Sequence, residues 1–517
     1  MSGTIEADPL AAVRDAVGDS AIISDDDQRQ LYGQDVFTVG GTPAAVFRPT
    51  NVEQLCAGVR AATSGGTIVV PRGGGMSYTS GYVAEAGALL VDMSRLDAIV
   101  ELDEANATVT VEAGCTWASL YSELHPRELR VPMWGTLSGI KATVGGGMSQ
   151  NGLFWGARNG SIAATALSFD VVLADGTLLT TGSKVLRPFG PDVTGLFAAD
   201  CGAFGIKASV TLPLIPEAAA FAYGSFAFEE PRGMAAAVSA IARAGLASEC
   251  FGFDPFLQSQ RMKRESLTSD ARALVGMMKA QGGFWKGLRE GAKVVGAGRS
   301  FLDDARFSIH TIAEGRTASA AEADMSAIRA IVGANGGREV ENSIPKVLRA
   351  NPFPPVNSML GPSGERWVPV HGIVGHGHAV ETIEAIISLF AANEDEMQRL
   401  SIGAGYMFLA AGTTGFLIEP VFFWPDARGA LHDHSVEPAH LARLERFEPN
   451  PPARALVETL RSAIIAIFGQ MGAAHFQVGR TYPLKQRSDP AAWRLLEALK
   501  SAADPRSTIN PGVLGLP

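Results

Sequence analysis

Hydrophobic residues recur at helical spacing in several stretches of the chain. In residues 8–32 the side chains of Leu10, Val13, Val17 and Ile22 would share one face of a helix. Because an amphipathic helix must bury its apolar face, we expect this stretch to form an arm that packs on the domain after it. The same periodicity predicts helices over residues 52–64, 117–124, 232–245 and 452–469.

Strand-like patterns occupy much of the remaining sequence. Short strands alternate with helices up to about Pro216, and from Ala218 onward the pattern is typical of helices that cover an antiparallel sheet. The sequence therefore predicts an α+β fold. Residues 268–303 are helix-prone and polar, and they are interpreted either as a lid or as an interface. The runs that predict strands are 66–70, 166–173, 223–228, 250–255 and 415–424.

These patterns divide the chain into four parts. We predict an N-terminal helical arm (1–40), a glycine-rich domain (41–216), a second domain (217–450) and a C-terminal segment that returns to the first domain (451–517). A chain of 517 residues is too long for one compact core, which agrees with two domains.

Charge and composition exclude some classes of partner. The formal net charge is −10 and no basic block occurs, so neither nucleic acid nor an anionic membrane is an expected partner. The first residues have no cationic region followed by an apolar core, and no apolar run is long enough to cross a bilayer. Four scattered cysteines show no metal-ligand spacing, and we expect a cytoplasmic protein.

Two glycine-rich segments carry the first chemical signal. The first, 71–78, follows a strand-like run and removes side chains from a tight turn, where backbone N–H groups can converge on anionic oxygens. It matches neither common nucleotide fingerprint, so by itself it fits a sharp loop equally well. The second, 136–152, is rich in glycine and hydroxyl groups. Two such cradles in one domain suit a long, extended dinucleotide better than a single phosphate.

At this point the chain resembles a known family. It is similar to the FAD-linked oxidases of the p-cresol methylhydroxylase and vanillyl-alcohol oxidase superfamily, which also holds D-lactate and glycolate dehydrogenases. The further segments that match in order are 89–96, 111–117, 196–206, 504–505 and 509–512. The resemblance implies a two-subdomain FAD-binding domain of the p-cresol methylhydroxylase type and a substrate domain with an antiparallel sheet covered by helices.

The resemblance also implies FAD as the cofactor and assigns residues to it. Many relatives tether FAD through a histidine of the first cradle, but Met76 stands at that place, so we expect non-covalent FAD. The residues assigned to the cofactor are Pro71, Arg72, Gly73, Gly74, Gly75, Met76, Ser77, Tyr78, Pro132, Thr136, Leu137, Gly139, Thr143, Val144, Gly146, Gly147, Ser149, Gln150, Asn151, Gly205, Ile206 and Asn510.

Candidate catalytic residues follow from the same resemblance. Arg480 is similar in place to an arginine that stabilises a phenolate in the phenol oxidases, although Gly479 replaces a tyrosine there and Gln150 replaces an acid in the second cradle. His475, Tyr482 and Glu419 are candidate acids or bases, and Glu419 within an apolar strand should need a partner. His371 and Tyr406 are further candidates.

A metal site is a weaker alternative. His371, His376 and His378 lie close in sequence, and some D-lactate dehydrogenase relatives use a metal beside the flavin. No Cys or carboxylate accompanies them, so we expect no metal.

Aromatic residues guide the choice of substrate. Several fall near the flavin or the cavity in the family pattern, among them Trp134, Phe154, Trp155, Phe423 and Phe476. They favour an FAD-dependent oxidoreductase that acts on a phenolic or aryl alcohol in aromatic compound catabolism, with electrons passed to oxygen or to an external carrier. The alternatives are a D-2-hydroxy acid dehydrogenase and a catalytically silent flavin-binding protein. Members of the family are often dimers or larger assemblies, so the resemblance leaves a homo-oligomer as one option for this chain.

Overall fold

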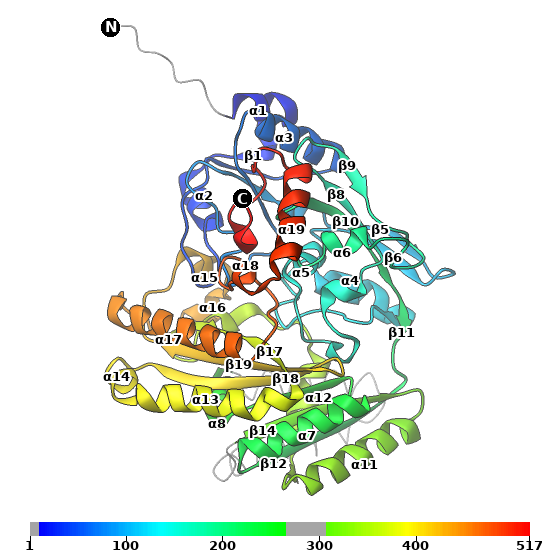
Figure 1. The fold of residues 1–517 in the computed structure, drawn as a ribbon, viewed down its shortest axis with the longest axis vertical. Coiled ribbons are helices and arrows are strands. Elements are labelled where there is room, and N and C mark those ends of the chain that lie inside the picture. Colours follow the sequence, from blue (N-terminus) through cyan, green and yellow to red (C-terminus); the bar gives the residue numbers. More distant parts are fainter. Residues whose placement is uncertain (1–9, 265–306) are drawn as a thin grey trace.

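A computed structural model describes residues 10–264 and 307–517 of the chain (Figure 1). It shows a mixed helix and sheet architecture with antiparallel sheets, which confirms the predicted fold class. Two small sheets build the N-terminal domain, and one large sheet builds the second domain below it in the view of Figure 1. The predicted helical segment within 268–303 lies outside the described residues.

The N-terminal domain contains a mixed, mainly parallel sheet and an antiparallel sheet. The first has the order β1-β2-β4-β3, in which β2, β4 and β3 run parallel. Its strands are β1 Ile22–Ile23, β2 Ala45–Phe47, β3 Val69–Arg72 and β4 Leu89–Asp92. The second has the order β5-β6-β10-β8-β9, with strands β5 Ile99–Asp103, β6 Thr108–Glu112, β8 Ser168–Val172, β9 Leu178–Thr180 and β10 Ile206–Pro213. A two-stranded pair joins β7 Leu129–Arg130 to β11 Ile215–Pro216.

Short helices connect these strands. Those predicted over 52–64 and 117–124 are confirmed with the same bounds, because Asn51 and Thr116 cap their first turns with side-chain oxygens. The helices are α1 Ala11–Val17, α2 Asp26–Tyr32, α3 Val52–Ser64, α4 Trp117–Leu124, α5 Val144–Gln150 and α6 Val193–Leu196.

The expectation of one helical face across residues 8–32 was wrong. The first helix stops at Val17 because Gly18 has φ +80°, and Ile22 lies in β1, paired with Phe47. A second helix, α2, begins after Asp25, whose carboxylate accepts from the N–H of Gln28. Leu10, Val13 and Val17 nevertheless bury their side chains in the core that contains β2 and α3.

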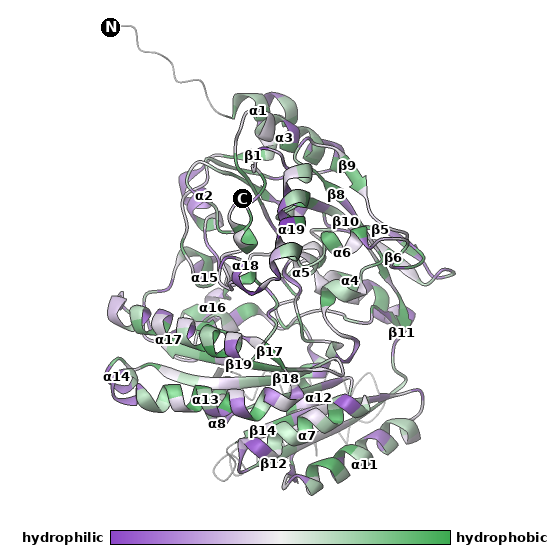
Figure 2. Ribbon diagram, in the orientation of Figure 1, coloured by the Kyte–Doolittle hydropathy of each residue, from purple (hydrophilic) through white to green (hydrophobic). Residues whose placement is uncertain are grey.

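The second domain is an antiparallel sheet of order β15-β12-β14-β13-β18-β19-β16, and β17 also pairs with β19. Helices pack on one face of this sheet, and their sides alternate between hydrophobic and hydrophilic residues in Figure 2. The strands are β12 Ala220–Phe228, β13 Glu249–Phe253, β14 Phe307–Gly315, β15 Arg338–Val340, β16 Arg366–Pro369, β17 Gly372–Gly375, β18 Gly403–Ala411 and β19 Gly415–Trp424. The helices are α7 Pro231–Ala244, α8 Pro255–Arg264, α11 Ala318–Ala334, α12 Ser343–Ala350, α13 Ala379–Ala392, α14 Glu394–Arg399, α15 Ala430–Ser435, α16 Pro438–Leu441 and α17 Pro451–Gln470.

Strand β19 is buried along its whole length and divides two cores. Phe416, Ile418 and Phe422 belong to the core under the helices, whereas Leu417 and Val421 belong to the core shared with the N-terminal domain. Side chains on a strand alternate between the two faces. The face of Leu417 and Val421 is therefore the one that meets the glycine-rich domain.

The C-terminal residues lie along β3 of the first domain. The N–H of Val69 donates to Thr508 O, and that of Asn510 donates to Val69 O. Buried Lys500 donates to Ala203 O and Asp504 Oδ2, so its charge is paired inside the domain. This segment contains α18 Leu484–Arg487 and α19 Pro490–Ala503.

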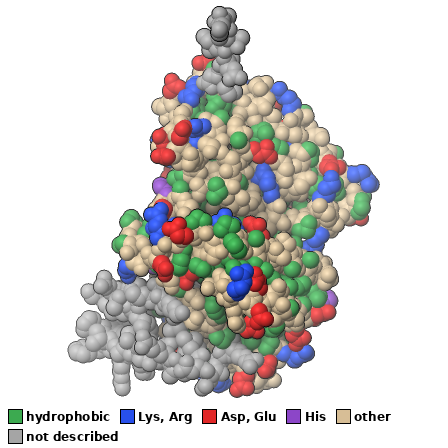
Figure 3. All heavy atoms as spheres, turned by 90° about the vertical axis from the view of Figure 1, so that its left-hand side faces the viewer, with side chains coloured by type: hydrophobic (Ala, Val, Ile, Leu, Met, Phe, Trp, Pro, Cys, Tyr) green, Lys and Arg blue, Asp and Glu red, His purple; other side chains and the backbone are tan. Residues whose placement is uncertain are grey.

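The surface is mixed in charge on the face drawn in Figure 3, where acidic and basic side chains are interspersed. In the described ranges, no helix combines the length and the apolar character that crossing a membrane requires.

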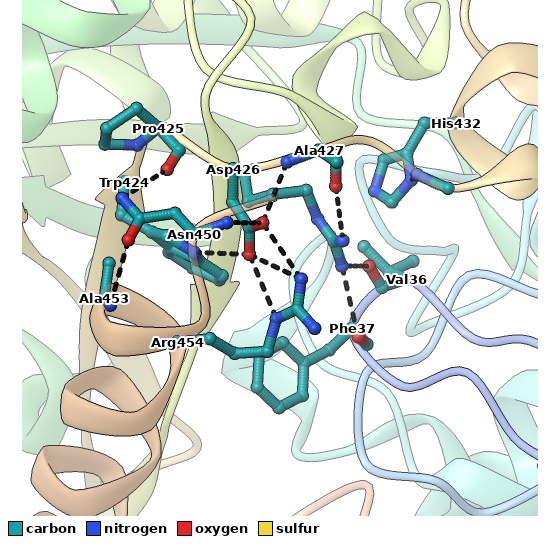
Figure 4. A network of polar contacts seen from close by, with 12 residues as sticks. Val36, Phe37, Trp424, Pro425, Asp426, Ala427, His432, Asn450, Ala453 and Arg454 are labelled. Carbon is teal, nitrogen blue, oxygen red and sulfur yellow. Dashed lines mark hydrogen bonds and ion pairs between the residues drawn. The ribbon is translucent and has the colours of Figure 1, made fainter. Parts of the chain in front are cut away.

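A polar network fastens the end of β19 to the start of α17 and to the N-terminal arm (Figure 4). The Asp426 carboxylate accepts from Trp424 Nε1 at 3.0 Å, from Asn450 N at 2.9 Å and from two nitrogens of Arg454. Arg366 donates to the carbonyls of Val36 and Ala427. The network therefore holds the arm against the second domain.

Replacing the central carboxylate should destabilise the fold. Burial alone would raise the pKa of Asp426, but the donors from Asn450, Trp424 and Arg454 hold that pKa below its usual value. We expect Asp426→Asn to cost about 2 kcal/mol of unfolding free energy at pH 7, because it weakens several charge-assisted hydrogen bonds. Chemical denaturation measures the loss.

The pH dependence and a matched control sharpen this test. Because the pKa is lowered on folding, the contribution is complete above about pH 4, the usual value for Asp, and disappears as the pH falls through the folded value. The difference between wild type and variant should therefore shrink toward pH 3. Asp433→Asn, at a more exposed carboxylate paired with Arg428, should cost less than about 1 kcal/mol. Equal losses for both variants would contradict the assignment.

Candidate functional site

The two glycine cradles line a cavity in the N-terminal domain. One wall comes from the end of β3 and its turn, and the opposite wall comes from the second cradle and α5. The lining residues are Pro71, Arg72, Gly73, Gly74, Gly75, Met76, Ser77, Tyr82, Met93, Ala113, Trp117, Thr136, Ser138, Ala142, Thr143, Gly145, Gly146, Gly147, Ser149, Gln150, Gly152, Cys201, Gly202, Gly205, Ile206, Lys207 and Gln477. We call this space the cradle cavity.

Glycine is required where the two cradles touch. A Cβ on Gly74 would lie 1.8 Å from Lys141 O, and one on Gly73 would lie 2.5 Å from Thr143 Oγ1. Gly75 has φ +71°, a conformation that L-residues with side chains rarely adopt. Among the described residues, no hydrogen bond is formed by the N–H groups of Gly74 and Gly75. The turn thus presents backbone donors without side chains.

Two buried side chains that line this cavity also carry hydrogen-bond donors without a partner among the described residues. Arg72 is 8% exposed, lies between the rings of Tyr32 and Tyr82, and forms neither a hydrogen bond nor an ion pair with any described residue. The indole N–H of Trp117 is likewise buried without a partner in the described part of the chain. Buried donors of this kind are costly unless a ligand satisfies them.

A second cavity lies between the N-terminal domain and the large sheet. It shares Met76, Thr136, Ser138 and Gln477 with the cradle cavity, so the two spaces adjoin. We call it the inner cavity. Its remaining lining residues are Val36, Tyr78, Leu137, Leu153, Phe154, Leu257, Val356, Ser358, Met359, Trp367, Met407, Glu419, Val421 and Phe476.

Glu419 is the carboxylate of the inner cavity. It lies on β19 between Leu417 and Val421, which fixes its direction toward the N-terminal domain. The Tyr78 hydroxyl donates to Glu419 Oε2 at 3.4 Å, and His371 Nδ1 lies 4.0 Å from the same oxygen. Burial, and then the Glu419 charge, raise the pKa of Tyr78 well above its usual value, so this hydroxyl keeps its proton.

His371 is fully buried behind Glu419. Its Nε2 hydrogen-bonds to the carbonyl of Phe476, which places the ring proton on Nε2 and leaves Nδ1 as the unprotonated nitrogen. Burial, and then the neighbouring His475, lower the pKa of His371 well below its usual value. A neutral imidazole therefore faces the carboxylate.

Most predicted cofactor residues line the cradle cavity, and the others lie elsewhere. Tyr78 and Leu137 line only the inner cavity. Asn151 ends α5 with φ +56°, and its side chain accepts from Ala163 N. Asn510 donates to the carbonyls of Gly81 and Cys201. Pro132 O accepts from Asn159 Nδ2, and Val144 is fully buried. With Gly139, these seven residues line no part of the cradle cavity.

Three of the four predicted catalytic residues line neither the cradle cavity nor the inner cavity, so a catalytic role for them stays a prediction. Arg480 donates to Ser80 O, Asn510 Oδ1 and Pro511 O, so its guanidinium holds backbone segments together. His475 hydrogen-bonds to His371 O and Arg487, and burial, opposed by the His371 carbonyl, lowers its pKa to about 4. The Tyr482 hydroxyl accepts from His371 N. Of the four, Glu419 lines the inner cavity.

The remaining candidates are also separated from the inner cavity. Tyr406 belongs to the core under the helices, on the opposite face of the sheet. His376 hydrogen-bonds to Ser239 and Thr413 O, away from His371. Within the described ranges, no three His, Cys, Asp or Glu side chains are grouped as metal ligands would be.

Sequence reasoning missed several lining residues. Trp117 ends the segment 111–117 that already matched the family, so it could have been assigned. Cys201 and Gly202 lie in the matching segment 196–206. Gln477 carries no sequence signal, because a single amide in a loop resembles any other polar loop residue.

Residues 43–182 match the family model described as "FAD binding domain". This range contains both cradles, and the geometry between them fits a dinucleotide, with glycine-lined backbone donors and the unpaired Arg72 cation for a pyrophosphate. The chain is therefore a dinucleotide-binding protein. Its N-terminal part is an FAD-binding domain, and FAD is its cofactor.

Comparison with curated proteins gives relatives among hydroxy acid enzymes. The chain is 28% identical over 177 residues to the glycolate oxidase subunit GlcD of Bacillus subtilis. The aligned region covers 34% of this chain and 37% of that protein. It is 29% identical over 228 residues to a probable mitochondrial D-lactate dehydrogenase of Danio rerio. That aligned region covers 42% of this chain and 45% of the dehydrogenase. The chain thus spans less than half the length of these relatives.

Solved structures show the same fold over nearly the whole chain. p-Cresol methylhydroxylase with substrate bound has a TM-score of 0.73 at 16% identity and covers 99% of this chain and 98% of its own. The 4-ethylphenol oxidase of Gulosibacter chungangensis in its isoeugenol complex has a TM-score of 0.71 at 17% identity, with 99% and 97% covered.

Removing the unpaired cation of the cradle cavity should weaken FAD binding. We expect Arg72→Gln to raise the Kd for FAD about 10–100-fold, because a hydrogen bond to a charged group contributes about 1.5–3 kcal/mol. Recovery of FAD fluorescence on dilution measures the release. Arg95→Gln, at an exposed arginine outside both cavities, should leave the Kd unchanged. Equal Kd values for wild type and Arg72→Gln would contradict a contact with FAD.

Proposed function

We propose that this protein is an FAD-dependent oxidoreductase that removes hydride from an alcohol-type or benzylic carbon of a neutral aromatic substrate. The observation that carries the proposal is the inner cavity beside the FAD site. It has four aromatic walls, Tyr78, Phe154, Trp367 and Phe476, and one carboxylate, Glu419. Among its described lining residues there is no Lys, Arg or His.

The charge of this cavity favours a neutral substrate over an acid. A 2-hydroxy acid would bring its own carboxylate next to Glu419, and like charges in a buried site repel strongly. A cation would have to compensate, and Arg480, the predicted catalytic cation, makes its hydrogen bonds elsewhere. Apolar and aromatic walls instead suit an aryl group.

Glu419 is the proposed base. When bound, FAD supplies the acceptor for hydride from the substrate carbon. Glu419 Oε2 would take the hydroxyl proton as the hydride leaves, and the Tyr78 hydroxyl orients this carboxylate. Behind it, His371 stays neutral because burial lowers its pKa, so the proton that is taken up stays on Glu419.

Other features of the proposal follow from the FAD site. We infer that FAD is bound without a covalent bond, since Met76 stands in the first cradle and burial raises the pKa of the Cys201 thiol to about 12. The electron acceptor is proposed to be oxygen or an external carrier.

A second candidate function is supported by the sequence relatives. The glycolate oxidase subunit and the probable D-lactate dehydrogenase favour a D-2-hydroxy acid dehydrogenase. A silent flavin-binding protein is the third candidate, and it predicts bound FAD that no organic donor reduces.

Anaerobic mixing of the yellow protein with donors distinguishes these candidates. We expect aryl alcohols or 4-alkylphenols to bleach the flavin absorbance and D-2-hydroxy acids to leave it unchanged, because the inner cavity carries a carboxylate and no described cation. Bleaching by a hydroxy acid, with competitive inhibition by oxalate, would move the assignment to the second function. Readmission of air then separates an oxidase, which regains its colour quickly, from a dehydrogenase.

Replacing the proposed base should slow flavin reduction without loss of the cofactor. We expect Glu419→Gln to lower the reduction rate about 10²–10⁴-fold, the usual range for a general base, at unchanged FAD content. Glu445→Gln, at an exposed carboxylate away from both cavities, is the control and should behave as wild type. A rate within twofold of wild type for Glu419→Gln would exclude Glu419 as the base.

A further inference from the structure

Gln477 lies in the wall between the two cavities. Four residues line both spaces, and Met76, Thr136 and Ser138 come from the glycine cradles, whereas Gln477 comes from the C-terminal segment after α17. The hydroxyls of Thr136 and Ser138 hydrogen-bond to each other at 3.1 Å. Gln477 is therefore the amide side chain at the place where a ligand of one cavity meets a ligand of the other.

The backbone at Gln477 is held in a conformation that glutamine disfavours. Its φ is +48°, in the left-handed region, and its N–H donates to Gln150 O. Two residues later a Cβ on Gly479 would lie 2.1 Å from Thr79 O, and the N–H of Arg480 donates to the same carbonyl. Both cradles thus fix this turn. A glycine would adopt this φ without strain, so the fold bears a conformational cost to place an amide side chain at 477.

The side chain is oriented by one hydrogen bond and keeps a donor for a ligand. Gln477 Oε1 accepts from Ser77 Oγ at 3.1 Å, and Ser77 Oγ lies 3.1 Å from Thr79 Oγ1. With Oε1 fixed in this way, Nε2 has no hydrogen-bond partner among the described residues. Its two hydrogens are the unused donors of the shared wall.

We propose that Gln477 donates from Nε2 to the redox-active ring of bound FAD and so raises the reduction potential of the flavin. A donor stabilises the ring more after reduction, because the ring then carries more electron density. The inference rests on the proposed function, since it places this ring at the wall shared with the inner cavity.

Reductive titration with dithionite against a reference dye tests the proposal in the FAD-loaded protein. Gln477→Met keeps the length of the side chain and removes the donor. At the wild-type midpoint potential we expect its ratio of reduced to oxidised flavin to fall about tenfold, which corresponds to about 30 mV for a two-electron couple. Gln477→Glu keeps an acceptor for Ser77 and adds an anion, so its ratio should fall further. The visible flavin absorption bands should shift in both variants.

Controls separate this effect from a structural one. Gln398→Met, at an exposed glutamine on α14, should leave the potential unchanged. Gln477→Asn retains an amide that tolerates the left-handed conformation and should recover part of the wild-type potential. If Gln477→Met does not retain FAD, the Gln477→Glu titration decides alone. Unchanged potential and spectrum in a folded, FAD-loaded variant would overturn the proposal.

The titration uses no organic substrate, so its result is independent of the substrate panel. A shifted potential together with no bleaching by aryl donors would refute the proposed function and retain the role of Gln477. Bleaching by aryl donors with an unchanged potential would support the proposed function and refute the role of Gln477.

Discussion

The contact between the two glycine cradles is the constraint on which the rest of the site depends. Gly74 lies so close to Lys141 O that a single added carbon would have to displace the backbone of the second cradle. The same closeness leaves backbone N–H groups and the Arg72 guanidinium facing a space that no described side chain fills. An anionic dinucleotide satisfies those donors. The same glycines are therefore needed both for binding FAD and for packing the domain.

The large sheet contributes the Glu419 carboxylate to this site because side chains on its strands alternate between the two faces. β19 is apolar on both faces except at Glu419, and its pairing with β18 and β16 sets which face each residue takes. A shift of one residue would turn Glu419 into the core under the helices, where neither Tyr78 nor the inner cavity could reach it. The position of the proposed base is therefore determined by strand register, with Leu417 and Val421 as its apolar neighbours.

Much of the fold could be predicted from the sequence, and most residues predicted for the cofactor line the cradle cavity, whereas the contacts of the predicted catalytic residues could not be predicted. Helices with a cap and an apolar face, such as 52–64, are local signals, and so are the cradles, whose glycines are needed by backbone packing. Arg480 and His475 were placed by resemblance of a short segment. Their actual partners, Ser80 O and Arg487, depend on how distant segments meet, which no local pattern records. Gln477 was missed for the same reason.

The substrate class is therefore better argued from the cavity than from the motif. Proteins named for glycolate and D-lactate match this chain in sequence, and p-cresol methylhydroxylase shares its fold, so this likeness cannot choose among their substrates. These substrates differ in charge, and a buried site must supply an opposite charge for a charged substrate. Here Glu419 is accompanied by a tyrosine hydroxyl that keeps its proton and by a neutral imidazole, and no described lining residue brings a cation. Among the described lining residues a second carboxylate would find no counter-charge, whereas a neutral ring would be held by the aromatic walls of the same cavity.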